Sequence, residues 1–531
     1  MAKTVTTSRA LIRNTFFNLL MLMSNAIVGF LLISFFLGQL GKACYGVWVL
    51  IGDQFRYRTL LGLGLNSAIN RRIPMYFAKD DEDGIRRVVS TALFFFTIIA
   101  MVLALLTILL AVKIGDWFTI EPELVRSASV LTLVVGFSFA ASMPLQLTTA
   151  VLSGLQRYDM VSITTVVVLA VRTTLTVVLL LRGYGLVTLG LIYGISEVIS
   201  RGVQHVLARR LLPAGYASWR YVDRRLLREM LFYGMNTFMY AMGALIIYVA
   251  SVTITGIFLT TSHVSQLKAA VAGLLLLSEF VQAFTAVIKP AISDLDARDD
   301  HTRVRQIAFV TQKYSLLILV PAGAFLIVMG RQFLTVWVGD DFGDPAVIQS
   351  MATVLAIFTA GYFFTLSQHS NFLVLAGRGE HKVFGILTAV EAVLCVSSAV
   401  FSVRALHLGL EGIAWSNFIP MALVAGAIIP VYFNRKMKIS AWDSIRNVWW
   451  PALLGTVPSV VLTVAWKRLA PPDSWREIFA VVGTSGAVAM LFAWFLSMDS
   501  VEHRRVLSIL RRRRSGPTPQ PVEVAPVPPM Q

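Results

Sequence analysis

Eight of the charged side chains that lie within, or near the ends of, long apolar stretches of the sequence are considered first. In the first half of the chain they are Asp53, Arg56, Arg58, Arg172 and Glu197, and in the second half they are Lys268, Glu279 and Glu391. A charged residue at membrane depth costs about 2.5–3.5 kcal/mol on insertion scales, so each one needs a partner or a water-filled cavity. These eight residues are therefore the first candidates for a functional site.

Asp53 and Arg56 lie about one helical turn apart. At about 100° per residue they share one face of a helix, whereas Arg58 points elsewhere. We therefore expect Arg56 to face a cavity with Asp53 beside it. Arg58 could instead form a structural salt bridge with Glu197. Arg172 could equally line the cavity or pack between helices, because a single arginine has no periodicity.

The four basic residues of this group fit an anionic, phosphate-bearing ligand. A guanidinium group binds phosphate oxygens bidentately, and in a low-dielectric cavity such contacts replace the hydration that a phosphate loses. The residues that we expect to bind the phosphate are Arg56, Arg172, Arg58 and Lys268. Lys268 lies near the end of its apolar stretch, so it could instead extend to the lipid headgroups.

The carboxylates of the group are candidates for coupling to an ion gradient. Desolvation penalises the charged form of a buried carboxylate, which then takes up a proton near neutral pH. The coupling candidates are Glu279, Glu391, Asp53 and Glu197. Glu279 and Glu391 are the strongest, but they could merely neutralise basic neighbours. We expect no cofactor and no bound metal other than a coupling H⁺ or Na⁺.

Three amide side chains, Asn25, Asn236 and Gln282, could bind sugar hydroxyls. They could equally hydrogen bond between helices, as polar residues in membrane proteins often do.

The composition places these residues in a membrane protein. The 531-residue chain is 56% hydrophobic and only 14% charged, whereas soluble domains carry about 25% charged residues. A membrane-spanning helix needs roughly 20 apolar residues. The sequence predicts an all-α polytopic protein with about fourteen spans, at 14–37, 45–67, 88–111, 127–152, 160–181, 185–207, 230–256, 265–288, 310–329, 347–372, 383–403, 410–432, 449–466 and 478–497.

The basic residues predict the orientation. Lys and Arg accumulate in cytoplasmic loops, and with a cytoplasmic N-terminus the inner segments hold 33 of the 46, the outer loops 10 and the spans 3. An even number of spans places both termini in the cytoplasm. The net charge of +17 therefore reflects topology and does not indicate nucleic-acid binding.

The loop sequences at 78–86 and 297–305 resemble each other at an offset of 219 residues. Because this offset corresponds to six spans, it predicts two halves of equal orientation, related by an axis along the membrane normal. The predicted division is a cytoplasmic tail 1–13, a first lobe 14–207, a basic linker 208–229, a second lobe 230–432, two additional helices in 433–497 and a tail 498–531. The linker could lie on anionic headgroups or serve only as a topology signal.

Several short motifs recur in the order and spacing of a known family. They are Tyr45-Gly46-Val47-Trp48, Gly62-Leu63-Gly64-Leu65 with Ala68 and Arg71, Ser153-Gly154-Leu155-Gln156-Arg157-Tyr158, Pro290-Ala291-Ile292-Ser293 and Trp337-Val338-Gly339. From about residue 8 to 440 the chain resembles the Wzx-type repeat-unit flippases of polysaccharide biosynthesis. Their superfamily also holds the multidrug antiporters and the peptidoglycan-precursor flippase.

The resemblance implies two six-helix lobes around a central cavity that opens alternately to either side. It implies a non-enzymatic flippase for an undecaprenyl-pyrophosphate-linked oligosaccharide in the bacterial inner membrane, so that the basic residues above would bind the pyrophosphate. Membrane lipids and, further, a glycan polymerase and chain-length proteins are the expected partners. The family often has an Asp where this chain has Ser251, and the group Asp53, Arg56 and Arg58 also departs from it.

Three other functions compete with this hypothesis. A multidrug antiporter would take organic cations, which three arginines in the spans would repel. A peptidoglycan-precursor flippase would use the same chemistry. A membrane glycan polymerase or ligase would need catalytic residues in sizeable outer loops, whereas the predicted outer loops are short.

Overall fold

The computed structural model describes residues 8–212, 216–285, 288–296, 298–380, 382–500, 502–504 and 508. Within these residues every regular element is a helix, and thirteen helices are long and apolar enough to cross a membrane. The protein is therefore a multi-pass membrane protein, as its composition predicts.

The first of these helices contains two spans. α1 (Ser8–Arg56) is 49 residues long and would measure about 74 Å if it were straight, more than twice the roughly 30 Å hydrocarbon core. It turns at Gly41, whose φ of 77° and ψ of 167° are not helical. The rings of Phe36 and Trp48, twelve residues apart, lie only 6.5 Å from each other. The chain thus reverses at Gly41, which gives the fourteen predicted spans.

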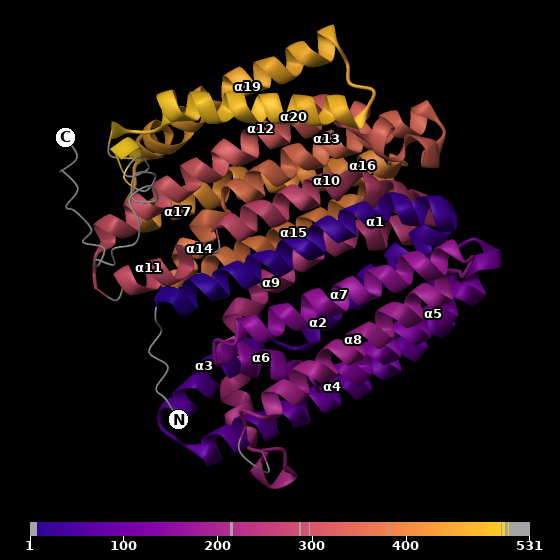
Figure 1. Ribbon diagram of the computed structural model, residues 1–531, viewed down its shortest axis with the longest axis vertical. Coiled ribbons are helices and arrows are strands. Elements are labelled where there is room, and N and C mark those ends of the chain that lie inside the picture. The colour runs from indigo at the N-terminus through magenta and orange to yellow at the C-terminus, as the bar shows by residue number, and fades with distance from the viewer. Residues whose placement is uncertain are drawn as a thin grey trace.

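The first half of the chain continues as one bundle (Figure 1). Its helices are α2 (Arg58–Leu61), α3 (Leu65–Ala78), α4 (Glu82–Trp117), α5 (Pro122–Ser142), α6 (Gln146–Gly154), α7 (Tyr158–Leu181) and α8 (Leu186–Arg209). A short turn of helix, η1 (Trp219–Tyr221), leads from this bundle to the second half.

The second half repeats this order of long and short helices. Its elements are α9 (Arg224–Phe258), α10 (Thr261–Thr285), α11 (Ile288–Asp296), α12 (His301–Phe342), α13 (Pro345–Ser367), α14 (His369–Gly377), α15 (Lys382–Arg404), α16 (Gly409–Leu423), η2 (Val424–Ile428) and α17 (Ile429–Met437). In Figure 1, α1 and α9 lie between the two bundles.

Two further spans pack against the outside of the second bundle, along α12 (Figure 1). They consist of α18 (Ala441–Ser444), η3 (Ile445–Trp449), α19 (Trp450–Leu469), α20 (Trp475–Phe492) and η4 (Ala493–Ser497). α1 begins and η4 ends on the same side of the molecule, which we call the terminal side; the opposite side is the far side.

The predicted duplication is visible in the backbone of the two similar loops. Asp80 and Asp299 both have a positive φ, of 52° and 55°. The next residue in each loop caps a long helix: the Asp81 side chain accepts a hydrogen bond from the Gly84 N–H, and the Asp300 side chain accepts one from the Arg303 N–H. A short carboxylate at a helix N-terminus satisfies an otherwise unpaired donor, so the two charged loops share one structural role.

The helix boundaries show the same duplication, with an offset of 223 residues outside these loops. This offset relates the first residues of α5 and α13 (Pro122 and Pro345), of α6 and α14 (Gln146 and His369) and of α8 and α16 (Leu186 and Gly409). The two lobes are therefore pseudo-symmetric, and α18 to η4 lie outside the repeat.

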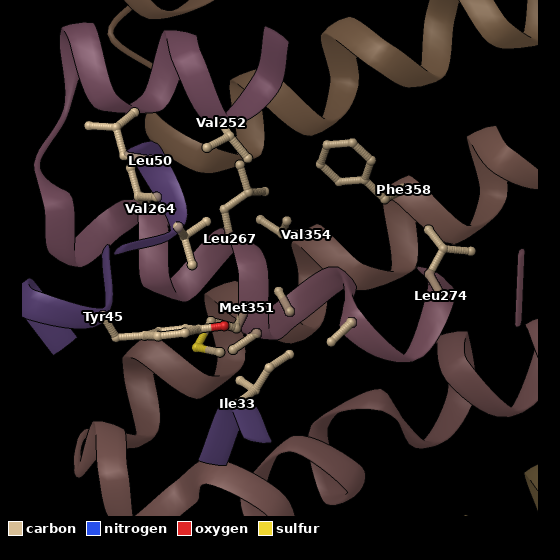
Figure 2. Packing of buried hydrophobic residues seen from close by; sticks show 14 of the residues in the cluster. Ile33, Tyr45, Leu50, Val252, Val264, Leu267, Leu274, Met351, Val354 and Phe358 are labelled. Carbon is tan, nitrogen blue, oxygen red and sulfur yellow. The ribbon is translucent and has the colours of Figure 1, made fainter. Parts of the chain in front are cut away.

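The largest cluster of buried apolar residues joins the two spans of α1 to the second lobe. Figure 2 shows Ile33, Tyr45 and Leu50 of α1 close to Leu267 of α10 and Met351 of α13. Among lipid tails, which are as apolar as these side chains, close van der Waals packing is what stabilises such a cluster. Some residues of this cluster, such as Ile33 and Tyr45, also line a cavity between the lobes.

Candidate functional site

A cavity of about 470 Å³ lies between the lobes. It is lined by both spans of α1, by α5 and α8 of the first lobe, and by α9 and α10 of the second. Six of the polar residues singled out above line it: Asn25, Asp53, Arg56, Arg58, Lys268 and Glu279. The structure therefore gathers residues that are up to 254 positions apart in the sequence.

The cavity is built from equivalent faces of the two repeats. The second span of α1 and the helix α10 contribute lining residues at the same 223-residue offset, namely Tyr45 and Lys268, Val49 and Ala272, Gly52 and Leu275, Asp53 and Leu276, and Arg56 and Glu279. Residues three to four positions apart lie on the same face of an α-helix. Each of the two helices therefore lines the cavity with one of its faces. Arg56 and Glu279 thus occupy equivalent positions with opposite charges.

Asp53 forms ion pairs with two cations, one from each lobe. Its Oδ1 lies 3.6 Å from Arg56 Nη1, and its Oδ2 lies 3.2 Å from Lys268 Nζ. Asp53 is only 5% exposed, whereas the Arg56 side chain is 43% exposed. The carboxylate is therefore enclosed, and the guanidinium remains accessible to a ligand in the cavity.

Lys268 does not extend to the headgroup region, which was one of its two expected positions. Its side chain is 18% exposed and faces Asp53, and its ammonium group donates a hydrogen bond of 3.4 Å to Tyr248 Oη. The ammonium points into the cavity because a carboxylate is available there to compensate its charge.

Tyr248 of α9 lies against both cations. The Arg56 guanidinium carbon is 4.2 Å from the centre of the Tyr248 ring, and Lys268 Nζ is 5.3 Å from it. Such cation–π contacts are favourable at partly desolvated sites. Sequence reasoning missed Tyr248, although the 223-residue offset relates it to Asn25, which also lines the cavity.

Arg58 lines the cavity and also forms the predicted pair with Glu197. Arg58 Nη2 lies 3.6 Å from Glu197 Oε1, and the same carboxylate lies 3.1 Å from Arg201 Nε. The guanidinium of Arg58 stacks on the ring of Phe139, with its central carbon 3.8 Å from the ring centre. Glu197 thus neutralises arginines within the first lobe and does not line the cavity.

Arg172 is not among the residues that line the cavity. Its guanidinium carbon lies 4.3 Å from the centre of the Tyr193 ring, and Tyr193 itself lines the cavity. Of the two expected positions for Arg172, the structure shows packing between helices. Arg172 therefore contacts Tyr193, which lines the cavity, without lining the cavity itself.

A second cavity, of about 140 Å³, lies inside the second lobe and contains Glu391 and Gln282. Glu391 is 1% exposed, and its Oε1 has no hydrogen-bond partner. Within the described part of the chain, no basic group lies within ion-pair distance of this carboxylate, so it does not neutralise a basic neighbour. Tyr248 lines both cavities, and it therefore forms a wall between Arg56 and Glu391.

The other predicted polar residues differ in their surroundings. Glu279 is exposed in the first cavity and has no ion-pair partner among the described residues. Asn25 donates a hydrogen bond of 2.8 Å to the Met21 carbonyl within its own helix. Gln282 donates one of 2.9 Å to Ser278. The side chain of Asn236 lies outside the described residues.

Ser251, which replaces the aspartate common in the resembling family, is buried in the second lobe. It accepts a hydrogen bond of 3.0 Å from the Asn417 amide. The two side chains form a neutral hydrogen-bonded pair at this position. Among the described residues no three His, Cys, Asp or Glu side chains gather as a metal site would require.

The comparison with known families agrees with this architecture. A model of the family described as "Polysaccharide biosynthesis protein" matches residues 11–296, which is more than half of the chain and includes the whole first lobe and the charged span of α10. The chain belongs to this family.

The solved structure of the lipid II flippase MurJ in an inward closed conformation superposes with a TM-score of 0.65 at 14% sequence identity, and covers 94% of this chain and 99% of that one. An inward-facing multidrug resistance MATE transporter of the MOP superfamily superposes with a TM-score of 0.58 at 16% sequence identity. The match covers 79% of this chain and 94% of that one. An outward-facing MATE transporter gives 0.57 at 16%. A search of curated proteins gives no significant match.

These likenesses show that this polysaccharide biosynthesis protein shares its fold with the MurJ flippase and the MATE transporters. The two lobes and the central cavity predicted from the resemblance are present. At such low identity the solved structures do not identify the ligand, which must be inferred from the cavity of this chain.

Proposed function

We propose that this protein flips an undecaprenyl-pyrophosphate-linked oligosaccharide from the cytoplasmic to the outer leaflet of the bacterial inner membrane, by alternating access, during surface polysaccharide biosynthesis. The observation that carries the proposal is the half-exposed guanidinium of Arg56, which faces a cavity between the lobes with Lys268 and Arg58 beside it.

The cavity suits an anionic headgroup for a physical reason. A phosphate that leaves water must exchange its hydration shell for other donors, and guanidinium and ammonium groups in a low-dielectric site supply charge-assisted hydrogen bonds. Three cations and two carboxylates line the cavity, so its charge remains positive. The apolar tail of such a lipid can stay in the bilayer while only the polar headgroup crosses between the lobes.

The terminal side of the molecule is cytoplasmic in this proposal, because the loops on that side carry most of the Lys and Arg residues. The far side, at which Gly46 of the first lobe packs directly on the Thr261 backbone of the second, then faces outward. The lobes are thus packed together at the outer end.

Coupling to a proton or sodium gradient belongs to the same proposal. An ionised carboxylate that is buried in a membrane without a cation is costly, so the Glu391 position favours a bound proton or a bound cation. The cavity of Glu391 shares Tyr248 with the cavity of Arg56. An ion bound on one side of this ring and a headgroup bound on the other would contact the same side chain.

The competing functions make different demands on the cavity. An exporter of organic cations would meet Arg56, Arg58 and Lys268, which repel its cargo. The peptidoglycan precursor is a lipid pyrophosphate as well, so the two flippase functions are distinguished by phenotype. Loss of the surface glycan with normal growth supports the proposed function, whereas lysis on depletion supports the other.

The test replaces Arg56 by Ala in the bacterium that carries the protein. We expect surface polysaccharide to fall by at least about tenfold, because the principal phosphate ligand is lost at a cost of roughly 1.5–3 kcal/mol. Lipid-linked glycan should accumulate in the cytoplasmic leaflet. Arg225→Ala, an exposed arginine outside the cavity, is the matched control. Normal export by R56A at normal protein level would refute a role of this cavity in binding.

A further inference from the structure

We propose that the Asp53 carboxylate occupies the phosphate subsite of the cavity between the lobes, and that a phosphate of the lipid headgroup must displace it from Lys268. This inference rests on the proposed function, in that it takes a lipid pyrophosphate as the ligand. In addition, Asp53 competes with the phosphate for Lys268. When the phosphate displaces Asp53, the ion pair between Asp53 and Lys268, which connects the two lobes, is broken.

The geometry of Asp53 is that of a bridging anion. One carboxylate oxygen faces Arg56 at 3.6 Å and the other faces Lys268 at 3.2 Å, so each oxygen compensates a different cation. A phosphodiester also has two unesterified oxygens that can each bind a different donor. The position between Arg56 and Lys268 therefore fits either anion.

Because both are negatively charged, the Asp53 carboxylate and a phosphate cannot both bind between Arg56 and Lys268. Asp53 is almost fully buried, so it is compensated by its two cations rather than by water. A phosphate bound between Arg56 and Lys268 would place a second anion against this enclosed carboxylate, and like charges at such a distance repel strongly at low dielectric. The carboxylate must therefore leave one cation when the phosphate arrives.

The displaced contact connects the two lobes. Asp53 belongs to the second span of α1, in the first lobe, whereas Lys268 belongs to α10 in the second. The contact of Arg56 with the Tyr248 ring also crosses between the lobes at this level. A ligand can shift a conformational equilibrium only through contacts that differ between the states. Exchange of Asp53 for phosphate on Lys268 supplies such a difference.

The first experiment measures binding of undecaprenyl pyrophosphate, without a glycan, to the purified full-length protein in nanodiscs. The Asp53→Asn variant should bind at least about fivefold more tightly than the wild type, a typical size for the coupling between two linked sites. Glu279→Gln is the matched control, because it removes the same charge from the same cavity but breaks no ion pair. Its effect should be clearly smaller than that of D53N.

The second experiment measures the distance between the lobes by spin labels in the two equivalent loops, at Asp83 and Thr302, with the two native cysteines replaced. In the absence of lipid, D53N should shift the distance distribution toward the one that the wild type shows with undecaprenyl pyrophosphate. Asp53→Glu retains the carboxylate and should keep the wild-type distribution, and it also controls for folding.

The outcomes separate this inference from the proposed function. If R56A loses binding while D53N binds no more tightly than E279Q, the lipid pyrophosphate remains the ligand and the competitor role of Asp53 is refuted. If the wild type does not bind the lipid, the proposed substrate is wrong. The distance measurement needs no ligand. If the distance distribution is unchanged in D53N, the ion pair between Asp53 and Lys268 does not affect the separation of the lobes, and that part of the inference is refuted.

Discussion

At the scale of single residues, two cavities separate the charged groups into different environments. Arg56 is partly exposed and retains free surface for a ligand, whereas Glu391 is almost inaccessible and has one carboxylate oxygen without a partner. A buried polar atom without a partner costs free energy that a stable structure rarely tolerates without a functional reason. Glu391 is therefore the residue at which an ion would have the largest effect.

Replacement of Glu391 by Gln should make transport independent of the ion gradient. The amide cannot take up a proton and binds a cation weakly, so flipping of a labelled lipid pyrophosphate in proteoliposomes should no longer respond to an imposed pH or sodium gradient. Glu279→Gln should retain the response, because Glu279 is exposed and its charge is solvated. An unaltered gradient dependence in E391Q would place the coupling at another residue.

Local periodicity predicted some contacts of the site and could not predict others. Asp53 and Arg56 are one turn apart, so the helical repeat alone placed them together. Lys268 reaches the same carboxylate only because α10 packs along α1, and helix packing cannot be read from a single sequence. For the same reason, Arg172 and Tyr248 could be placed only in the folded structure.

At the scale of helices, a buried ion pair fixes the last two spans to the second lobe. Lys313 of α12 lies 2.7 Å from Glu502, which follows η4, and donates a further hydrogen bond of 3.0 Å to the Ser497 carbonyl. Both charged side chains are largely buried. The pair thus determines where the chain leaves the membrane after its last span.

Removal of one partner of this pair should destabilise the packing of α19 and α20 on α12. We expect Glu502→Ala to cost about 3–5 kcal/mol, because it leaves a buried ammonium without a counter-ion, and the apparent melting temperature in detergent should fall. The double variant with Lys313→Met should recover most of the loss. Asp294→Ala, which breaks the exposed pair with Arg298, should change stability by less than about 1 kcal/mol. Equal effects of E502A and D294A would contradict this role.

The elements themselves were largely predictable, because length and apolar content determine which segments can span a membrane. The sequence also revealed the duplication, through Asp80 and Asp299 and their capping neighbours. The break predicted between the spans 14–37 and 45–67 also agrees with the structure, in which the chain turns at Gly41. That turn depends on a glycine with a positive φ, which other residues adopt with difficulty.

At the scale of the whole molecule, an even number of spans and the distribution of Lys and Arg predict the orientation in the membrane. A cysteine at Tyr184, between α7 and α8, or at Asp473, between α19 and α20, should react with a membrane-impermeant maleimide in intact spheroplasts. A cysteine at Thr302, at the start of α12, should react only after permeabilisation. The opposite pattern would invert the orientation and hence the proposed direction of transport.

The equivalence of Arg56 and Glu279 has an electrical consequence. In the present protein the two positions carry opposite charges, so a group in the cavity meets a cation at one position and an anion at the other. A cargo with an anionic end and a neutral end is therefore oriented with its phosphates near Arg56 and Lys268 and its neutral part toward Glu279.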